Sequence, residues 1–195
     1  MPYTTAHKAK TRERIVDSAH ALFNRKGFVE VSIDEIMAHA RLTRGGFYSH
    51  FETKEDLFVE AIAIYGRRHP TDRWDDVDLD LSCTGSKLAS GMINAYLSRA
   101  HLADITGHCP LIAQPSDVAR ASSRVKEAYR GLLEGMAGMF AAAMPDIEAE
   151  RARQRGLALA ALCVGGMVLA RTFDDATFSN QIREAVRAMA LESLG

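Results

Sequence analysis

Two adjacent glycines stand in the most distinctive short run of this sequence, TRGGFYSHF at residues 43–51. Each glycine costs a helix about 1 kcal/mol relative to alanine, so Gly45 and Gly46 make this run a poor helix by propensity. Three aromatic residues follow them: Phe47, Tyr48 and Phe51. A bare backbone is useful where another backbone must come close, and a nucleic-acid strand is the physical candidate. The run therefore points to nucleic-acid binding.

The sequence lacks the residue groupings that carry common enzyme chemistry. It has no HExxH motif, no Gly-rich phosphate loop and no Ser/His/Asp grouping, and its 7 histidines are scattered. We therefore expect no enzyme activity, no cofactor and no metal. An enzyme or a ligand-binding protein on an all-α scaffold that does not bind DNA stays a remote alternative.

Composition places the positive charge at one end of the chain. The 195 residues carry a net charge of -1, but residues 1–50 hold 8 Lys/Arg against 5 Asp/Glu, a net of +3. Three widely spaced cysteines without a CxxC motif favour a reducing compartment. No apolar run reaches about 18 residues and no signal-peptide pattern is present, so we expect a soluble, cytoplasmic protein without a membrane partner.

Hydrophobic periodicity predicts helices throughout. Apolar stripes at helical spacing, two capping boxes (Ser32 with Glu35, Thr53 with Asp56) and a left-handed cap at Gly27 mark the ends of the first elements. The expected helices span about residues 11–25, 33–40, 43–51, 54–68, 86–103, 116–143 (one helix or two), 147–173 and 179–193. No segment alternates at period two, so the fold is expected to be all-α, with about nine helices.

The remaining segments set the expected domain boundaries. Residues 1–10 are expected to be a mobile basic arm, and the polar stretch 71–85 a linker or long loop. Residues 104–115 are expected to form a bent loop with a helical turn around Pro110 to Ala113. We therefore expect a three-helix module over 1–52, a connecting helix over 53–70 and a second helical domain over 71–195.

Residues 11–58, TRERIVDSAHALFNRKGFVEVSIDEIMAHARLTRGGFYSHFETKEDLF, resemble the DNA-binding module of the TetR family of bacterial regulators. The most specific part is 43–51 followed by Lys54 and Glu55. The resemblance implies a helix-turn-helix with 43–51 as recognition helix, followed by a ligand-binding and dimerisation domain. It implies a repressor that binds a pseudo-palindromic double-stranded DNA operator as a homodimer and is released by a small-molecule effector, although activation is the alternative direction.

One residue departs from the family pattern. The family usually has glycine at the turn residue just before Leu42, and this chain has Arg41. A left-handed conformation would cost arginine on the order of 1 kcal/mol. Arg41 is therefore either a mildly strained turn residue or an additional DNA contact.

The helix-turn-helix assignment gives roles to nine residues. Arg44 can make a bidentate contact to guanine and is expected to read a base, with phosphate contact alone as the alternative. Tyr48 and His50 resemble family positions whose polar tips bind phosphate, whereas Phe47 and Phe51 are expected to pack in the core. The expected DNA-binding residues are Ser32, Arg41, Thr43, Arg44, Gly45, Gly46, Tyr48, His50 and Lys54.

The second domain is expected to supply the dimer interface and the effector pocket. Small residues in the last two helices would allow a four-helix bundle between two chains, with packing inside one chain as the alternative. The expected interface residues are Ala161, Gly165, Ile182, Val186 and Met189. The expected pocket residues are Met92, Tyr96, Cys109, Leu111, Tyr129, Leu133 and Met136, with ordinary core packing as the alternative. No Lys/Arg cluster accompanies them, so the expected effector is apolar or neutral.

Cys109 carries an alternative function. It lies in the bend Gly107-His108-Cys109-Pro110, where a neighbouring histidine could lower the thiol pKa and make it reactive. Some TetR-like regulators sense reactive species through such a cysteine, so a redox or electrophile sensor acting through Cys109 is the alternative, and an inert thiol is the simpler interpretation. A metal site from His101, His108 and Cys109 is disfavoured because the usual short spacing is absent.

Overall fold

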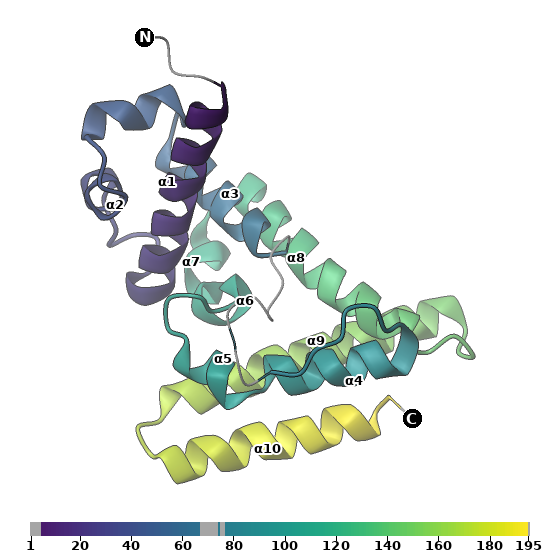
Figure 1. The fold of residues 1–195 in the computed structure, drawn as a ribbon. Coiled ribbons are helices and arrows are strands. Elements are labelled where there is room, and N and C mark those ends of the chain that lie inside the picture. Colours follow the sequence, from purple (N-terminus) through teal and green to yellow (C-terminus); the bar gives the residue numbers. More distant parts are fainter. Residues whose placement is uncertain (1–4, 67–73, 75–76, 195) are drawn as a thin grey trace. The chain divides into compact units, whose positions relative to one another are not determined.

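The computed structural model describes residues 5–66, 74 and 77–194 (Figure 1). These residues form ten α-helices and one short 3-10 helix, with no strand among them, so the predicted all-α fold is confirmed. The helices pack into two units. One combines the N-terminal residues to 67 with residues 105–129, and the other combines 68–104 with 130–195. Each unit is described by itself.

Helix α1 (Thr5–Lys26) is the centre of the N-terminal unit. It packs against α2 (Ile33–His39) and α3 (Lys54–Tyr65), as Figure 1 shows. Its stripe of Ile15, Ala19 and Phe23 is fully buried, and Phe23 meets the Phe58 ring edge-on with 5.1 Å between centroids. The predicted three-helix core is therefore present, held mainly by apolar burial.

Helix α1 begins earlier in the chain than the sequence predicted. The basic arm expected to be mobile over residues 1–10 is helical from Thr5 onward, while residues 1–4 lie outside the described part. The segment Ala-His-Lys-Ala-Lys before Thr11 contains good helix formers, so it extends a helix whose nucleation cost is already met by the packed part. At the other end, Gly27 has a φ of 84° and its N–H bonds the carbonyl of Phe23, as the left-handed cap requires.

Residues 105–129 belong to the same unit and contain α6 (Pro110–Ala113), α7 (Pro115–Arg120) and the start of α8 (Ser123–Ala142). The helical turn expected at Pro110 to Ala113 is α6. The predicted 116–143 segment forms two helices, α7 and α8. This segment is bonded to the turn between α1 and α2, because the Asp117 carboxylate accepts the backbone N–H of Phe28 at 2.6 Å. The expected boundaries at 52 and 70 stay a prediction, and residues 67–70 lie outside the described part.

The second unit contains α4 (Gly85–Tyr96), α5 (Arg99–Ala103), α9 (Ala149–Thr172) and α10 (Ala176–Glu192). The single helix predicted over 86–103 is wrong: the chain breaks at Leu97 and Ser98, where the Ser98 hydroxyl caps α5 by accepting the N–H of His101 at 3.0 Å. Helices α9 and α10 run side by side (Figure 1). They approach closely at Gly166, where a Cβ would lie 2.8 Å from the methyl groups of Val186.

Part of the stretch expected to be a linker is packed. Trp74 and Leu79 are buried with Ala95, and the Trp74 indole donates to Asp104 at 3.2 Å. The Trp74 ring also lies 4.3 Å from the His101 ring, centroid to centroid. Trp74 and Leu79 thus belong to the core of the second unit.

Helix α9 is long and apolar enough to cross a membrane by length and composition alone. The core helix of a soluble protein passes the same test, so this feature is weak evidence for a membrane partner.

Candidate nucleic-acid interface

The turn after α2 is a Schellman motif with arginine at the position that favours glycine. The Ser32 hydroxyl caps α2 by accepting the N–H of Glu35 at 3.1 Å. At the other end the N–H of Leu42 bonds the Met37 carbonyl at 2.8 Å, and the N–H of Arg41 bonds the Ala38 carbonyl at 2.9 Å. Arg41 has a φ of 55°, the only positive φ outside glycine among the described residues. The turn is therefore regular in its hydrogen bonds and strained at Arg41.

The segment predicted to be the recognition helix is a 3-10 helix, η1 (Arg44–Ser49), rather than an α-helix over 43–51. Thr43 occupies its N-cap with an extended backbone, but its side chain makes no cap hydrogen bond, which corrects the predicted cap. Two adjacent glycines weaken an α-helix here, so the short, tighter helix is a reasonable outcome. Phe47 and Phe51 are buried, as expected, and anchor η1 to the core.

Internal packing does not require the two glycines of η1. A Cβ at Gly45 would meet nothing within 4 Å, and one at Gly46 would make only an ordinary contact with the Met37 methyl at 3.6 Å. Gly45 is exposed, and the neighbouring Tyr48 is 60% exposed with its ring edge-on to Phe47. Gly45 therefore leaves bare backbone on the surface beside an exposed aromatic side chain.

Arg44 lies at the first position of η1 and forms an ion pair with Asp34. The distance from Arg44 Nη1 to the Asp34 carboxylate is 2.6 Å, and both side chains are more than half exposed. Asp34 lies in the first turn of α2, where a carboxylate also interacts favourably with the helix dipole. The sequence pattern gave no sign of this pair, because it joins residues ten positions apart across a turn.

Lys54 is the first residue of α3, and its side chain also binds the segment between α1 and α2. Its ammonium donates to the carbonyls of Phe28 and Val31, at 2.7 and 2.8 Å, and lies 4.3 Å from the centre of the Phe28 ring. Burial lowers the pKa of Lys54, with the nearby Asp117 charge opposing that shift. Two of the three N–H donors of Lys54 are thus used in hydrogen bonds within the protein. The phosphate contact of Lys54 stays a prediction, and it would use the third donor.

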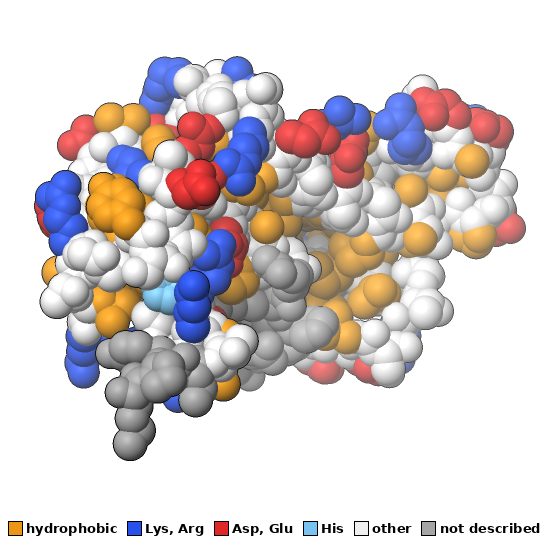
Figure 2. Space-filling model, turned by 90° about the horizontal axis from the view of Figure 1, so that it is seen from above, with side chains coloured by type: hydrophobic (Ala, Val, Ile, Leu, Met, Phe, Trp, Pro, Cys, Tyr) orange, Lys and Arg blue, Asp and Glu red, His pale blue; other side chains and the backbone are white. Residues whose placement is uncertain are grey.

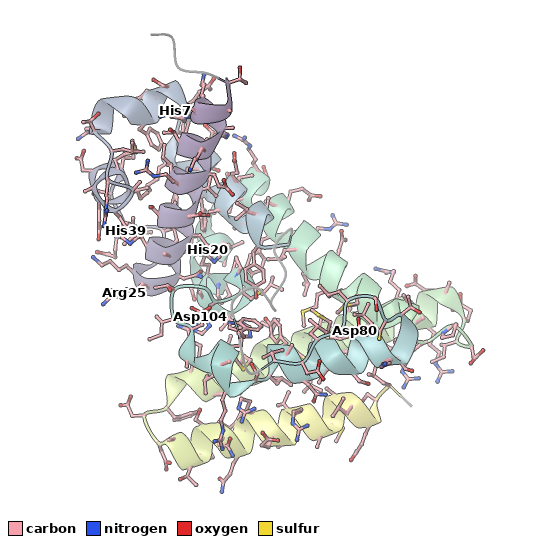
Figure 3. The ribbon with its side chains drawn as sticks, viewed as in Figure 1. His7, His20, Arg25, His39, Asp80 and Asp104 are labelled. Atoms are coloured by element: carbon pink, nitrogen blue, oxygen red, sulfur yellow. The ribbon has the colours of Figure 1, made fainter. Side chains whose placement is uncertain are left out.

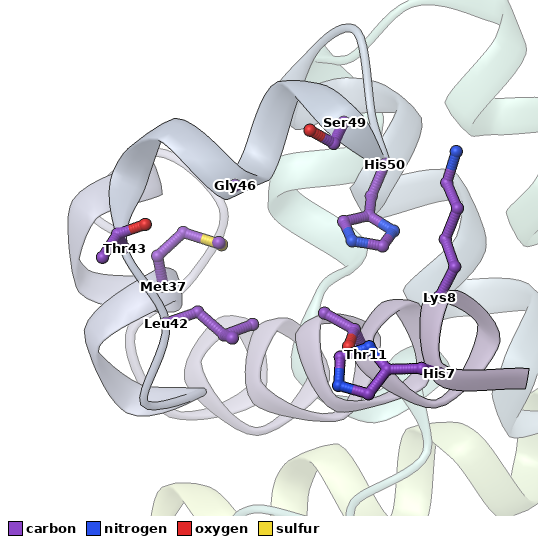
Figure 4. A pocket seen from close by; sticks show the side chains of 9 residues that line it. All are labelled: His7, Lys8, Thr11, Met37, Leu42, Thr43, Gly46, Ser49 and His50. Carbon is purple, nitrogen blue, oxygen red and sulfur yellow. The ribbon is translucent and has the colours of Figure 1, made fainter. Parts of the chain in front are cut away.

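His50 follows η1 and lines a cavity of about 380 Å³ between α1 and η1 (Figure 4). Figure 4 shows its imidazole, the Lys8 side chain and the hydroxyl groups of Thr11 and Ser49 around this cavity. The Nδ1 atom of His50 is buried and makes no hydrogen bond within the described part of the chain. Burial lowers the pKa of His50, and the charges of Lys8 and Arg12 lower it further. The full lining is His7, Lys8, Thr11, Met37, Leu42, Thr43, Gly46, Ser49 and His50.

Arg12 is a positioning residue that the sequence analysis missed. Its guanidinium donates to the His50 carbonyl, forms an ion pair with Glu60 and lies 4.0 Å from the centre of the Phe51 ring. It therefore ties α1 and α3 to the end of η1. Its place on the polar side of α1 was visible in the sequence, but these three partners were not.

The charge is mixed on the face of the molecule drawn in Figure 2. On this face, Lys and Arg side chains are interspersed with Asp and Glu rather than gathered in one patch. His7 and His20 lie apart on α1, and His39 lies at the end of α2 (Figure 3). Among the described residues, no three His, Cys, Asp or Glu side chains are grouped to hold a metal ion. Any DNA recognition therefore depends on local placement of side chains rather than on bulk charge.

The predicted pocket residues are divided between the two units. Cys109, Leu111 and Tyr129 belong to the N-terminal unit, where the Tyr129 hydroxyl donates to the Leu111 carbonyl at 2.9 Å. Burial raises the pKa of Tyr129, with a smaller contribution from Cys109. The others, Met92, Tyr96, Leu133 and Met136, belong to the second unit, where Met92 packs against the Trp74 cluster. A common pocket for all seven stays a prediction.

The predicted interface residues lie on α9 and α10. Ala161 and Met189 are exposed, and a Cβ at Gly165 would meet nothing within 4 Å. Ile182 is half-buried, whereas Val186 is occupied inside the chain by its contact with Gly166. Four large apolar side chains on and between these helices are 43% to 54% exposed: Leu169, Phe173, Phe178 and Met189. Of these four, Met189 was predicted for the interface and the other three were not.

Cys109 is buried at the start of α6, with 2% of its surface exposed. Cys163 is also buried, and that burial raises the pKa of its thiol to about 12. Cys83 is the most accessible of the three, and its thiol donates to Asp80 at 3.1 Å. The location of Cys109 thus disfavours rapid attack by a reagent in solution, since a reactive thiol needs access as well as thiolate character.

Comparison with known proteins identifies the family. The sequence model of bacterial regulatory proteins of the tetR family matches residues 15–61, which span most of α1 through α3. The uncharacterized HTH-type transcriptional regulator TtgW of Pseudomonas putida is 30% identical over 95 residues, which are 49% of this chain and 69% of that protein. The HTH-type transcriptional repressor BepR of Brucella suis is 40% identical over 62 residues, which are 32% of this chain and 30% of that protein.

The similarity of fold extends over nearly the whole chain. A TetR transcriptional regulator from Legionella pneumophila superposes with a TM-score of 0.72 at 20% identity, covering 97% of this chain and 99% of that one. At this identity the likeness shows the fold alone. Together with the match to TtgW and the family model over the helix-turn-helix, it places the chain: this protein belongs to the TetR family of bacterial regulatory proteins and is a DNA-binding transcription regulator.

Proposed function

We propose that this regulator is a homodimeric repressor that binds a pseudo-palindromic operator and is released by an apolar or neutral small molecule. The observation that carries the DNA part is the exposed start of η1. Thr43, Arg44 and Gly45 are all exposed, while Phe47 holds the helix to the core from its buried side. In a helix-turn-helix the N-terminal residues of the recognition helix face the base edges in the major groove.

The roles of the individual residues follow from their chemistry and exposure. Arg44 carries the planar donor pattern that fits the O6 and N7 atoms of guanine. The exposed tip of Tyr48, the imidazole of His50, the guanidinium of Arg41 and the hydroxyl of Ser32 are suited to phosphate oxygens. Gly45 and Gly46 would let the DNA backbone or base edges approach without a side chain between them.

A second copy of the chain is the partner that the apolar surface of α9 and α10 favours. Leu169, Phe178 and Met189 are exposed, and Gly165 leaves room for a neighbouring helix. Two helices from each chain would bury these side chains in a four-helix bundle and give the dimer the twofold axis that a palindromic operator matches. One helix-turn-helix contacts too few bases for high specificity, which is a further reason for two copies.

The proposal of repression is supported by the name of one relative. The proposal of release by an effector is supported by the apolar residues of the second unit. BepR is named a repressor, and its similarity to this chain is confined to less than a third of its length. The candidate pocket residues Met92, Leu133 and Met136 are half-buried and apolar, which suits an apolar or neutral effector. Effector binding would favour a conformation whose recognition helices no longer fit the operator, with α3 as the connecting element. A DNA-binding regulator of this kind would work in the cytoplasm.

Selection of binding sites from a randomised duplex library tests this proposal. The protein should enrich an inverted repeat whose half-sites lie one helical turn, or a multiple of it, apart. Two chains should bind each duplex, as measured by the mass of the complex in light scattering. Enrichment of a single unrepeated site, or one chain per duplex, would contradict the dimeric part of the proposal. No enrichment above random sequence would contradict specific DNA binding by this chain.

A further inference from the structure

The ion pair between Asp34 and Arg44 places a carboxylate on the surface that we expect to face DNA. Asp34 is in the first turn of α2, and Arg44 is the first residue of η1. The Asp34 carboxylate is 2.6 Å from Arg44 Nη1, with 57% of the Asp34 side chain and 63% of the Arg44 side chain exposed. A negative charge here is unfavourable for binding to phosphate in general. The helix dipole accounts for a carboxylate in the first turn of α2, but it does not account for the ion pair of that carboxylate with Arg44.

A carboxylate at this position restricts the guanidinium. The five N–H donors of arginine lie in one plane, so binding one nitrogen also fixes the direction of the others. With Nη1 bonded to Asp34, the donors on Nη2 and Nε remain for another acceptor. A guanine presents two acceptors, O6 and N7, that fit two such donors. Asp34 therefore selects one orientation of Arg44 out of the many open to a flexible side chain.

The same carboxylate opposes binding that does not use this geometry. Exposed Arg44 without Asp34 could bind any phosphate in reach, and that contact carries no sequence information. Asp34 compensates the charge of Arg44 and repels phosphate, which weakens binding to DNA of any sequence. Specificity is the difference between the affinities for the operator and for other DNA. A residue that weakens binding to other DNA therefore raises specificity as effectively as one that strengthens binding to the operator.

We propose that Asp34 is a positioning residue for Arg44 and that it sets the operator specificity of this regulator by holding the guanidinium for one base and by opposing phosphate contact. This inference rests on the proposed role of Arg44 in reading a base. It goes beyond that role, because Asp34 itself was assigned no part in DNA binding.

Glu35 provides a matched control. It is the next residue of α2, carries the same charge in the same helical turn, and forms an exposed ion pair with Lys26 instead of with Arg44. Asp34→Asn and Glu35→Gln therefore remove the same charge and nearly the same helix-dipole interaction. Only Asp34→Asn removes the charge that pairs with Arg44.

The experiment measures base preference for wild type, Asp34→Asn, Glu35→Gln, Arg44→Ala and the double variant Asp34→Asn/Arg44→Ala. Each protein is used as the full chain, its preferred sequence is selected from a randomised duplex library, and its affinities for the wild-type sequence and for single-base variants are measured by fluorescence anisotropy. Asp34→Asn should lose up to about fivefold of the preference at the base read by Arg44, which is the most that an exposed ion pair typically contributes. It should also bind random DNA several-fold more tightly. Glu35→Gln should keep the wild-type preference.

The outcomes separate this inference from the proposed function. If Arg44→Ala abolishes the preference and Asp34→Asn leaves it unchanged, Asp34 is not a positioning residue, although Arg44 reads a base. If Arg44→Ala leaves the preference unchanged, base reading by Arg44 fails and the inference fails with it. If Asp34→Asn still changes the preference in the Arg44→Ala background, Asp34 reads a base directly, and the positioning role is overturned. An equal loss in Glu35→Gln would assign the effect to charge alone and would also overturn it.

Discussion

The side-chain amide of Gln114 donates a hydrogen bond to the side-chain oxygen of Asn24 across 2.9 Å, and both residues are buried. Asn24 in turn donates to the carbonyl of His108 at 2.8 Å. These bonds join α1, the central helix of the DNA-binding module, to the segment that contains α6 and α7. Residues 105–129 are therefore connected to this module by buried polar contacts as well as by apolar packing, so a change in that segment can reach α1.

Removing Asn24 should destabilise the protein. In Asn24→Ala the His108 carbonyl and the Gln114 amide each lose the buried hydrogen bond to Asn24, and a lost hydrogen bond of this kind costs about 1 kcal/mol. We expect the free energy of unfolding, measured by urea denaturation, to fall by about 2 kcal/mol or more. Asn94→Ala removes an exposed asparagine from α4 and should change it by less than about 0.5 kcal/mol. Equal losses in the two variants would mean that the buried contacts contribute no more than a surface asparagine.

Replacing Arg41 by glycine should raise the stability of the protein and weaken its binding to DNA. Arg41→Gly relieves the positive φ, so the free energy of unfolding should rise by about 0.5–1 kcal/mol after the entropy of glycine in the unfolded chain is subtracted. If Arg41 contacts a phosphate, the slope of log affinity against log salt should fall by about 1. Arg41→Ala is the control, because it removes the charge and keeps the strain. A decrease in stability for Arg41→Gly would contradict the strain at this turn.

DNA binding should take up a proton at His50. In the free protein the pKa of His50 is lowered from its ordinary value of 6.5, first by burial and then by Lys8 and Arg12. A DNA phosphate in the adjacent cavity would favour the charged imidazole and raise that pKa. Affinity, measured by anisotropy at constant ionic strength, should therefore rise as the pH falls from about 7.5 to about 6, and His50→Gln should remove this dependence. The same dependence in His50→Gln would exclude His50 as its source.

The same shift predicts a stability effect of opposite direction in the free protein. Because the folded pKa of His50 is lowered, the unfolded chain binds its proton at a higher pH than the folded chain does. The contribution of neutral His50 to stability is present above about pH 6.5 and is lost as the pH falls through the folded pKa. His50→Gln should make the unfolding free energy less sensitive to pH in this range, whereas His39→Gln, at an exposed site, serves as control.

Cys109 should be slow to react in the native protein. With Cys109 and Cys163 buried and Cys83 half-buried, iodoacetamide should label Cys83 first, as mass spectrometry of peptides would show. Operator binding should therefore survive brief treatment with an electrophile. Release of DNA by the electrophile in the wild type, and its absence in Cys109→Ser, would instead establish the alternative in which Cys109 is the sensor.

Local signals in the sequence predicted the starts of α2 and α3 well. The capping interaction at Ser32 and the full capping box of Thr53 with Asp56 are present, and both mark the helix starts that were predicted from them. Such signals depend on residues three positions apart, so the sequence displays them directly. Arg41 was also noticeable from the sequence, because glycine is the expected residue where the backbone is left-handed.

Contacts between distant residues were beyond the sequence pattern. Lys54 was expected to bind phosphate. In the structure its ammonium donates to the backbone carbonyls of Phe28 and Val31, which lie 26 and 23 positions earlier in the chain. The Arg44 pair with Asp34 depends on the geometry of the turn between them. The break at Ser98 was missed because the apolar stripe continues across it, and only the capping hydroxyl and the packing of α5 against α9 favour two helices.

The central claim is that the start of η1 reads the DNA sequence, and one titration tests it most directly. Wild type and Arg44→Ala are each titrated with the duplex selected by the wild type and with a scrambled duplex of equal length, at several salt concentrations. We predict that Arg44→Ala loses at least about tenfold of the ratio between the two affinities, because one bidentate base contact discriminates by about 1–3 kcal/mol. An unchanged ratio, with both affinities lowered equally, would show that Arg44 contacts phosphate alone and would contradict the account.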